Sequence, residues 1–412
     1  MKVAVVGSGG REHALAACLA RTAEVVVTPG NPGIAGSTSQ PVDELGVDLV
    51  VVGPETPLVE GLADRLRARG TLVFGPGADG ARLEGSKAWM KDVLVGAGVA
   101  TARHGTFDEF DGADAFLDTL GDLFVIKTDG LAAGKGVLVT SSRREASEAV
   151  RGYLSGARFG DAGRRVVIEE GLTGPEVSLL VLCDGSRLVP LAPAQDYKRV
   201  GTGDNGPNTG GMGAYSPVPA ITAAIVEQLL ATAVGPTLHE LRRRGIDYRG
   251  VLYAGLMLTP DGPKVIEYNV RFGDPETQVV LPRYAGDLAE ILRQAADGAL
   301  VDEATFVDDM AVTVVCAAAG YPGPLRIGDV IRGLEDARTV PGVQVFAAGV
   351  GADSVGALVT AGGRVLDVTA VAPTLAQARK RAYEAVGHLS WPGMHTRADI
   401  ALLGDSMTKE AP

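Results

Sequence analysis

Hydrophobic and polar positions follow two repeating patterns over about the first hundred residues. Four short, uniformly apolar runs read as strands: KVAVVG from Lys2, EVVVTPG from Glu24, DLVVVGPE from Asp48 and TLVFGP from Thr71. The intervening segments EHALAACLA and LVEGLADRLRARG carry apolar residues at helical spacing. Strands that are apolar on both faces are typical of a parallel sheet covered by helices, with ligands at the carboxyl ends of its strands. The pattern predicts an α/β fold that opens with a doubly wound parallel-sheet domain.

The middle of the chain has a mixed, partly α+β pattern. After the helix SKAWMKDVLVGAG, the segment LFVIKTDGLAAGKGVLVTSS reads as a strand, a glycine-rich flap and a second strand. RRVVIEEGLTGPEVSLLVL adds two strands with a short connection at residues 169–172. The segment AQDYKRVGTGDNGPNTGGMGAYSP from Ala194 reads as a long loop, which is usually either functional or disordered. Its tyrosines and methionine favour a substrate loop over a disordered linker.

The last hundred residues predict a smaller antiparallel unit. Strands AVTVVCAAAGYP, VQVFAAGV and RVLDVTAVA precede one helix, TLAQARKRAYEAVGHL. We expect this unit to pack on the first sheet and to wall the ligand site, with Gly320–Gly323 as the contact. The predicted domains are residues 1–101, residues 102–300 with a flap subdomain at about 121–186, and residues 301–412.

Composition narrows the class of protein. The chain has 412 residues, of which 46% are hydrophobic and 21% charged, as is ordinary for a soluble globular protein. No apolar run approaches the ~18 residues of a membrane span, and Lys2 leads straight into a strand without a signal peptide. The net charge of −12 argues against nucleic-acid binding, and three scattered cysteines indicate reduced thiols. We therefore expect a cytoplasmic enzyme of small anionic metabolites, monomeric or a weak homodimer, with no nucleic-acid or membrane partner.

The stretch VIEYNVRFGDPET from Val265 carries the most chemistry. Read as a strand, it places Glu267, Asn269 and Arg271 on one face, because side chains alternate with period two. The alternate apolar residues would enter a core: Ile266, Tyr268 and Val270. Carboxylate and amide oxygens suit Mg²⁺ or Mn²⁺, and a guanidinium is a fork for phosphate or carboxylate. The alternative is a half-exposed strand with its polar face in water, which the flanking glycines and acids disfavour.

The loop GSGGREH resembles a dinucleotide fingerprint with two defects. Glu12 stands near the place of the third glycine, and the second strand ends in Thr28-Pro29-Gly30 without the acidic residue that binds a ribose. Both defects count against NAD. The backbone of Gly9 and Gly10 at a helix start could still cradle a phosphate, or the loop could be merely a tight turn. The loop GPETPL, which contains Glu55, could close over the same ligand.

The flap Gly130–Gly136 is not a Walker loop, because Lys135 is followed by glycine and then by a strand. Lys127 would rise from its first strand and Lys135 would stand at its tip, so that the flap could lie over a polyphosphate. An adenine could contact the connection at residues 169–172, with Glu176 near a ribose. Taken alone, the sequence of that connection is too common to indicate a site.

Together these motifs resemble a known family. GGREHAL, GPETPL, EGSKAW, KTDGLAAGKGV, IEEGL, QDYKR, GPNTGGMGAYSP and EYNVRFGDPETQ occur in the order found in the phosphoribosylamine–glycine ligase (glycinamide ribonucleotide synthetase) family of purine biosynthesis. That family belongs to the ATP-grasp superfamily. The resemblance covers nearly the whole chain, and its last two motifs are highly specific. It implies an ATP-grasp fold in which two subdomains clamp ATP.

The resemblance also implies site residues, carried over motif by motif. The implied ATP contacts are Lys87, Lys127, Gly134, Lys135, Glu169, Glu170, Leu172 and Glu176, with the lysines at the phosphates, Glu169, Glu170 and Leu172 at the adenine and Glu176 at the ribose. The implied metal ligands are Glu267 and Asn269. The implied substrate contacts are Gly9, Gly10, Glu55, Asp196, Lys198, Arg199, Thr209, Gly210, Gly211 and Arg271, with Arg271 and Lys135 as catalytic groups.

The implied reaction has two steps. Glycine attacks the γ-phosphate of ATP to form glycyl phosphate, and the amine of 5-phosphoribosylamine then displaces phosphate. Three rival functions remain at this stage. They are a carboxylating ATP-grasp enzyme that activates bicarbonate, an NAD-dependent oxidoreductase built on the first domain, and a nucleotide-binding regulator without turnover.

Overall fold

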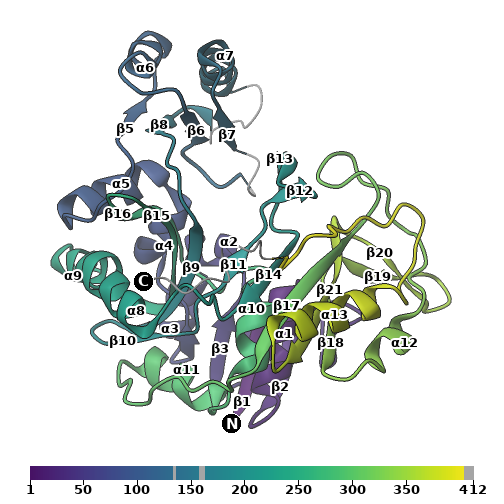
Figure 1. Ribbon diagram of the computed structural model, residues 1–412. Coiled ribbons are helices and arrows are strands. Elements are labelled where there is room, and N and C mark those ends of the chain that lie inside the picture. The colour runs from purple at the N-terminus through teal and green to yellow at the C-terminus, as the bar shows by residue number, and fades with distance from the viewer. Residues whose placement is uncertain (133–135, 157–162, 403–412) are drawn as a thin grey trace.

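The computed structural model describes residues 1–132, 136–156 and 163–402. Gly134 and Lys135, two of the predicted flap residues, lie outside this range. Figure 1 shows three regions: a lower body near the N-terminus, a small lobe above it, and a C-terminal unit beside it. No helix in the described ranges combines the length and the apolar character that crossing a bilayer requires.

The N-terminal sheet is parallel, as predicted. Its strands lie in the order β2-β1-β3-β4, with bounds Glu24–Pro29, Lys2–Gly7, Leu49–Val52 and Leu72–Phe74. Val3 and Val5 enter one core, whereas Ala4 and Val6 enter another, so both faces of β1 are buried. This explains why the strands read as uninterrupted apolar runs.

The helices of this domain differ from prediction at one place. Helix α1 spans Gly10–Leu19, as expected, but the segment predicted as one helix from Leu58 forms two, α2 (Glu55–Val59) and α3 (Leu62–Arg67). Gly61 between them has φ +78°, a left-handed conformation that ends a helix. Helices α4 (Ala78–Gly85) and α5 (Lys87–Gly96) then lead out of the domain.

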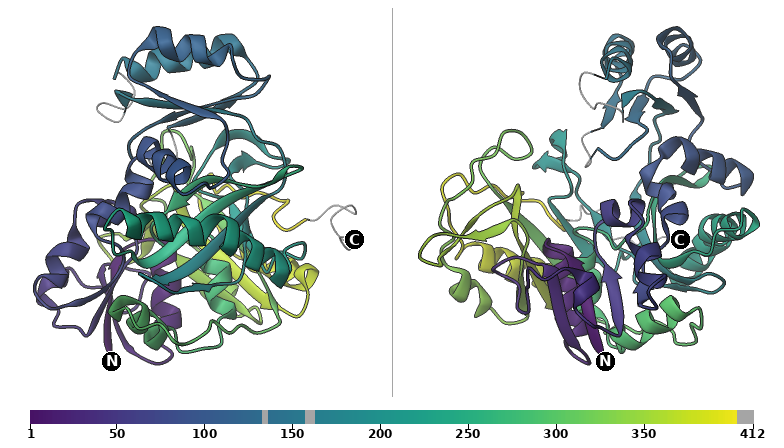
Figure 2. Two further views of the ribbon diagram at one scale, coloured as in Figure 1. Left: turned by 90° about the vertical axis from the view of Figure 1, so that its left-hand side faces the viewer. Right: turned by 180° about the vertical axis from the view of Figure 1, so that it is seen from behind.

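The small lobe is a four-stranded antiparallel sheet in the order β5-β8-β6-β7. Its elements are β5 (His104–Phe107), α6 (Phe110–Leu117), β6 (Phe124–Thr128), β7 (Val137–Thr140), α7 (Arg143–Leu154) and β8 (Val166–Glu170). Helices α6 and α7 pack on its outer face around Phe124 and Ile126 (Figure 2). This lobe differs from the predicted flap subdomain of residues 121–186, because β5 joins its sheet and the strand after β8 joins another.

The central sheet is antiparallel, in the order β10-β9-β15-β16. Its strands are β9 (Glu176–Asp184), β10 (Leu188–Pro190), β15 (Arg249–Thr259) and β16 (Gly262–Asn269). Strands β15 and β16 form an antiparallel hairpin that leads into the glycine- and acid-rich segment after Asn269. Helices α8 (Ala223–Leu229) and α9 (Gly235–Arg243), joined by a π-helical turn at Leu230–Val234, cover one face, and α10 (Thr277–Val280), a 3-10 turn (Leu281–Arg283) and α11 (Leu288–Asp297) follow β16.

The segment from Ala194 to Pro217 is more regular than predicted. It contains β11 (Gln195–Asp196), the hairpin of β12 (Arg199–Gly201) and β13 (Asn205–Asn208), and β14 (Gly213–Ser216). Strands β11 and β14 join the C-terminal sheet, in the order β11-β14-β17-β21-β18. Glycine-rich spacing hid these strands, because their partners lie far along the chain.

The C-terminal unit is the predicted antiparallel sheet with a helix against it. Its elements are β17 (Met310–Ala317), α12 (Leu334–Arg338), β18 (Val343–Ala347), the hairpin β19 (Val350–Ala352) and β20 (Leu358–Thr360), β21 (Arg364–Ala372) and α13 (Leu375–Val386). The turn Gly320–Gly323, which the sequence predicts to contact the first domain, does not make that contact among the described residues. Tyr321 from that turn instead accepts the N–H of Gly210 with its hydroxyl, at 3.0 Å.

The contact with the first domain is made by β18 and the loop after it. Nδ1 of His13 accepts the N–H of Ala347 at 2.8 Å, and the amide of Asn31 donates to the carbonyls of Ala347 and Ala348 at 3.3 and 3.1 Å. The His13 ring also meets Phe346 edge-on. Backbone and side-chain hydrogen bonds thus join two units that begin about 300 residues apart.

Acid should weaken this contact. Burial, aided by Arg338, lowers the pKa of His13 from 6.5 to about 4. Protonation of Nδ1 would remove the acceptor of the Ala347 N–H. The unfolded chain then binds the proton more tightly, so stability is lost as pH falls from 6.5 to 4, by on the order of 2–3 kcal/mol. Urea unfolding between pH 7 and pH 4 measures this loss. The variant His13→Asn should show a shallower dependence, and an unchanged slope in that variant would contradict the assignment.

Candidate active site

A cavity of about 490 Å³ lies between the small lobe and the body. Strands β6 and β7 and the end of β8 line it from the lobe, and β16 with α5 line it from the body. Arg11, Thr209 and Arg364 add side chains from the first domain, the β12–β14 region and the C-terminal unit. Segments that are distant in sequence therefore meet at one cavity.

Strand β16 presents its polar face to this cavity, as predicted. Glu267 and Asn269 on β16 and Arg271 just after it all line the cavity, whereas Val270 is buried in the core away from it. Tyr268 is also buried in the core, although it contributes to the lining. Ile266 departs from the prediction, because it lines the cavity and is not among the buried residues. The cause is an irregularity in pairing with β15, where Gly255 pairs with Glu267 but Leu256 pairs with Val265, which leaves Ile266 as an extra residue.

Arg271 is held by acids from the first domain. Its Nη2 donates to Glu84 Oε1 at 2.9 Å and to Asn269 Oδ1 at 3.2 Å, and its Nε lies 3.4 Å from Glu55 Oε2. Despite burial, Glu84 and Glu55 raise the pKa of Arg271. The carboxylate of Glu84 also accepts the Val270 N–H at 2.9 Å. The guanidinium is therefore fixed in position, as a preorganised donor needs to be.

Glu267 is surrounded by cations that do not pair with it. No hydrogen bond or ion pair engages its carboxylate within the described part of the chain. Burial would raise its pKa, but Lys198, Lys127 and Lys87 outweigh burial and lower it, so the group is ionised at neutral pH. Nine carboxylates and six basic side chains line the described cavity. An ionised carboxylate beside an amide oxygen, in a cavity with excess negative charge, fits a divalent cation that takes further oxygen ligands from phosphates.

A buried ion cluster connects the lobe to the body. Glu169 on β8 lies 2.8 Å from Lys127 Nζ and 2.9 Å from Lys91 Nζ, and its side chain is 3% exposed. The two lysines overcome burial and lower the pKa of Glu169, while burial lowers the pKa of Lys91 to about 8. Lys127 also donates to the carbonyl of Ile266 at 3.2 Å. The Glu169 carboxylate is thus occupied by lysines, and only its backbone remains for the predicted adenine contact.

Near this cluster the cavity is apolar. Its lining there comes from the small lobe and from the body: Leu123, Val125, Val139, Leu172, Met257 and Ile266. Glu170, at the end of β8, accepts the Arg103 N–H at 3.0 Å and lies 3.4 Å from Lys264 Nζ. A flat apolar ring could lie between these side chains, with backbone groups of residues 169–172 at its edge.

Lys198 joins three predicted residues. Its Nζ donates to Glu176 Oε2 at 2.7 Å and to Asp196 Oδ1 at 3.1 Å, and its backbone carbonyl accepts the Thr209 hydroxyl. Burial raises the pKa of Asp196 to about 7, with Lys198 acting in the opposite direction. Lys87 lines the cavity from the start of α5, and its Nζ donates to the carbonyl of Gly130 at 3.1 Å.

Four predicted substrate residues do not line the cavity: Gly9, Gly10, Arg199 and Gly211. The reason is clearest at Gly9, whose N–H donates to the Glu12 carboxylate at 2.6 Å. The Glu12 side chain also fills the space beside Gly7 and Gly53, where a Cβ would lie within 2.6 Å of it. The missing third glycine is therefore replaced by an internal carboxylate, which occupies the cradle that a dinucleotide would use.

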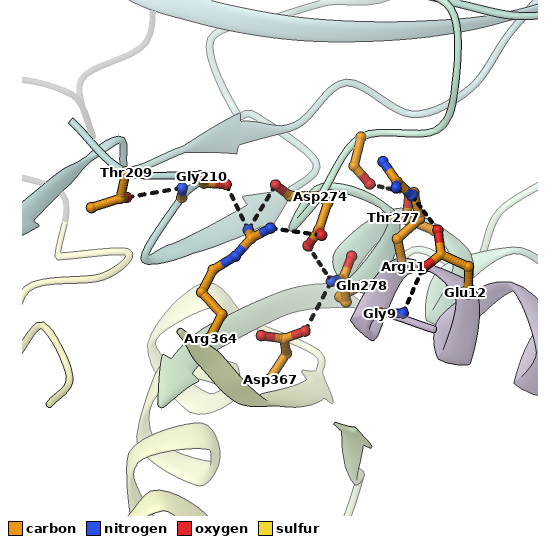
Figure 3. Close-up of polar contacts among 12 residues, drawn as sticks. Gly9, Arg11, Glu12, Thr209, Gly210, Asp274, Thr277, Gln278, Arg364 and Asp367 are labelled. Atoms are coloured by element: carbon orange, nitrogen blue, oxygen red, sulfur yellow. Dashed lines mark hydrogen bonds and ion pairs between the residues drawn. The ribbon is translucent and has the colours of Figure 1, made fainter. Parts of the chain in front are cut away.

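Sequence reasoning missed six charged or polar residues of the lining: Arg11, Glu84, Asn208, Asp274, Glu276 and Arg364. Five of them lie within or next to motifs quoted above, so the signal was present but no role was assigned. Arg364 had no such signal. It reaches Asp274 from β21, 90 residues away, with Nη2 at 2.7 Å from Oδ2 (Figure 3).

Family models match the chain in three consecutive parts. They are the phosphoribosylglycinamide synthetase N domain over residues 1–84, its ATP-grasp (A) domain over 85–277 and its C domain over 311–403. The chain is 48% identical to the phosphoribosylamine–glycine ligase of Brucella melitensis over 97% of both proteins. It also matches the crystal structure of phosphoribosylamine–glycine ligase from Thermotoga maritima, with a TM-score of 0.84, 34% identity, and coverage of 97% of this chain and 100% of that one.

A more distant match shows the fold alone. The biotin carboxylase domain of Hydrogenobacter thermophilus 2-oxoglutarate carboxylase aligns with a TM-score of 0.72 at 17% identity, over 96% of this chain and 91% of that one. The predicted ATP-grasp fold is confirmed by the match to the ATP-grasp (A) domain model and by the Thermotoga maritima structure. From the three family models and the full-length relatives, the chain belongs to the phosphoribosylamine–glycine ligase family.

Proposed function

We propose that the protein ligates glycine to 5-phosphoribosylamine at the expense of ATP, giving glycinamide ribonucleotide, ADP and phosphate in purine biosynthesis. One observation carries the proposal. Glu267 and Asn269 on β16, with Arg271 just after the strand, meet Lys87 and Lys127 in one cavity. The full-length similarity to phosphoribosylamine–glycine ligases supports the same substrates.

ATP is proposed to lie with its adenine in the apolar part of the cavity and its phosphates toward Lys87 and Lys127. Leu172 and the backbone of Glu169 and Glu170 would contact the base, and Glu176 the ribose. Gly134 and Lys135 remain proposals from the sequence alone, since they lie outside the described residues. Lys127 is already held by Glu169, so its ammonium is oriented before ATP arrives.

Glu267 and Asn269 would hold Mg²⁺ or Mn²⁺. The fit rests on the ionised, unpaired Glu267 carboxylate and on the excess of carboxylates around it. When bound, such an ion neutralises phosphate charge and orients the phosphates. Asn269 shares its amide oxygen with Arg271, so one strand would position both the cation and the guanidinium.

The protein's own contribution is positioning and charge. The glycine carboxylate attacks the γ-phosphorus and ADP leaves, after which the amine attacks the acyl carbon and phosphate leaves. Negative charge grows on phosphoryl oxygens in the first step and on the acyl oxygen in the second, which suits the fixed fork of Arg271. The small lobe covers the cavity and would shield glycyl phosphate from water.

The second substrate and glycine are proposed to lie near Glu55, Asp196, Lys198, Thr209 and Gly210, which all line the cavity. Gly9, Gly10, Arg199 and Gly211 are kept as proposed contacts of lower priority, because they lie outside the lining. A monomer or a weak homodimer is proposed as the working unit. Domain boundaries near residues 101 and 300 are proposed from the sequence pattern.

The test is ADP formation by the purified protein in the presence of Mg²⁺. We expect turnover only when glycine and phosphoribosylamine are both present, and hydroxylamine should trap a glycyl intermediate from ATP and glycine. ADP release that requires bicarbonate instead would favour a carboxylating enzyme, and ATP binding without ADP formation would favour a regulator. Either result would overturn the proposal.

A further inference from the structure

Two buried oxygen atoms directly behind the cavity wall have no hydrogen-bond partner within the described ranges. They are Oδ1 of Asp367, on β21, and Oε1 of Gln278, on α10. The side chains are 1% and 0% exposed. Burying a polar atom without a hydrogen-bond partner is unfavourable. Two such atoms in a pair of side chains that contact each other need a reason other than stability.

The contact between these residues leads to the cavity. The amide nitrogen Nε2 of Gln278 donates to Asp367 Oδ2 at 3.0 Å and to Asp274 Oδ1 at 2.8 Å (Figure 3). Asp274 lines the cavity, whereas Gln278 and Asp367 do not. Asp367 therefore reaches the cavity only through the Gln278 amide, whose two hydrogens are both used.

Strand β21 holds Asp274 from a second direction. Nη2 of Arg364 donates to Asp274 Oδ2 at 2.7 Å, and Nη1 donates to the carbonyls of Asp274 and Gly210 at 3.0 and 2.6 Å. Figure 3 shows Arg364 and Asp367 rising from the same strand toward Asp274 and Gln278. Each Asp274 oxygen thus accepts one bond from the protein and keeps a lone pair for a further donor.

The first domain covers the remaining side of Asp367 and Gln278. A Cβ at Gly10 would lie 1.8 Å from Asp367 Oδ2 and 2.9 Å from Gln278 Nε2, so the glycine allows the start of α1 to lie directly against them. Gly10, which the resemblance also implies as a substrate contact, has this packing role in the structure. Three segments from different parts of the chain therefore confine the Asp367 carboxyl.

We infer that Asp367 is a positioning residue, which acts through Gln278 to hold the Asp274 carboxylate in the orientation that receives the amino group of a substrate. The inference rests on the proposed function, in which both glycine and phosphoribosylamine carry an amino group. Asp274 is bonded to Arg364 of the C-terminal unit, which also bonds Gly210, and none of these three residues belongs to the small lobe that carries most of the proposed ATP contacts. ATP binding should therefore not depend on Asp367.

The ionisation of Asp367 distinguishes this role from a structural one. Burial, with Asp274 acting in the same direction, raises the pKa of Asp367 from 3.8 to about 7, although Arg364 and Gln278 oppose the change. A carboxyl whose pKa is higher in the folded state lowers stability as pH rises past its unfolded value, and the loss is complete above the folded value. At pH 8, removal of the carboxyl should therefore not lower stability.

The experiment compares Asp367→Ala with Asp367→Asn at pH 8. In the alanine variant we expect kcat/KM for glycine or phosphoribosylamine to fall at least tenfold, with the KM for ATP unchanged and a Tm no lower than that of the parent protein. Asparagine keeps an oxygen that accepts from Gln278 and should restore most of the activity. Varying each amine substrate at saturating levels of the other shows which amino group Asp274 receives.

Three further variants keep the test decisive. Gln278→Leu should reproduce the kinetic defect, and the double variant with Asp367→Ala should be no worse than either single variant, because one path is interrupted twice. Thr369→Val is the matched control, since Thr369 is buried on the same strand but its hydroxyl donates to Thr313 at 2.9 Å, without a path to the cavity. It should change no kinetic constant.

Several outcomes would overturn the inference. They are normal kinetics of Asp367→Ala, an asparagine variant as impaired as the alanine variant, or a lowered Tm with equal losses for ATP and both amines. The last would indicate a structural role. Failure of the proposed function is distinguishable, because the parent protein itself would then form no ADP that depends on both amines.

Discussion

Replacing Glu267 with glutamine should lower turnover about a thousandfold while the protein stays folded. The carboxylate is the only charged member of the proposed metal pair, and glutamine keeps its shape but not its charge. Loss of a preorganised electrostatic group at a reacting phosphate costs 10²- to 10³-fold, and a metal ligand belongs at the upper end of that range. ADP production at increasing Mg²⁺ concentrations measures the effect.

Binding separates this role from a general change in the cavity. In the parent protein Mg²⁺ should tighten ADP binding in calorimetry, and in Glu267→Gln that enhancement should disappear. Glu176→Gln is the comparison in the same cavity, because Glu176 is held by Lys198 and is proposed to contact ribose. It should raise the KM for ATP without changing the Mg²⁺ dependence. Near-normal turnover of Glu267→Gln would exclude it as a metal ligand.

Replacing Arg271 with methionine should lower kcat about a hundredfold, equivalent to ~3 kcal/mol of transition-state stabilisation. The structure adds a second expectation. Without the guanidinium, Glu84 and Glu55 lose their shared partner, and burial already raises the pKa of Glu84. Breaking a buried ion pair from one side typically costs about 3–5 kcal/mol, so the variant should also unfold at a lower temperature.

A paired substitution tells the two effects apart. The double variant Arg271→Met, Glu84→Gln removes both charges and should recover much of the lost Tm but none of the lost kcat. Arg271→Lys keeps the charge and loses the fork, so we expect an intermediate rate. If the double variant regained activity along with stability, Arg271 would be a structural residue and its catalytic role would be wrong.

Much of the architecture is predictable from local patterns. The parallel sheet follows from apolar runs whose two faces both need burial. The C-terminal strands and helix follow from the different spacing of apolar residues in strands and in helices. Where a local pattern misled, a specific feature intervened. Gly61 broke one predicted helix, and the pairing irregularity opposite Gly255 turned Ile266 from the core toward the cavity.

The site was predictable as a set of residue types, but not as a set of contacts. The sequence alone determined that a strand presents Glu267, Asn269 and Arg271 on one face, because alternation is a local property of the backbone. Only the tertiary structure decided that Lys91 and Lys127 share Glu169, that Glu12 fills the glycine cradle, and that Asp367 meets Gln278. Each of these pairings joins side chains from separate elements, and the geometry that brings such elements together depends on the packing of the whole chain, which no local pattern encodes.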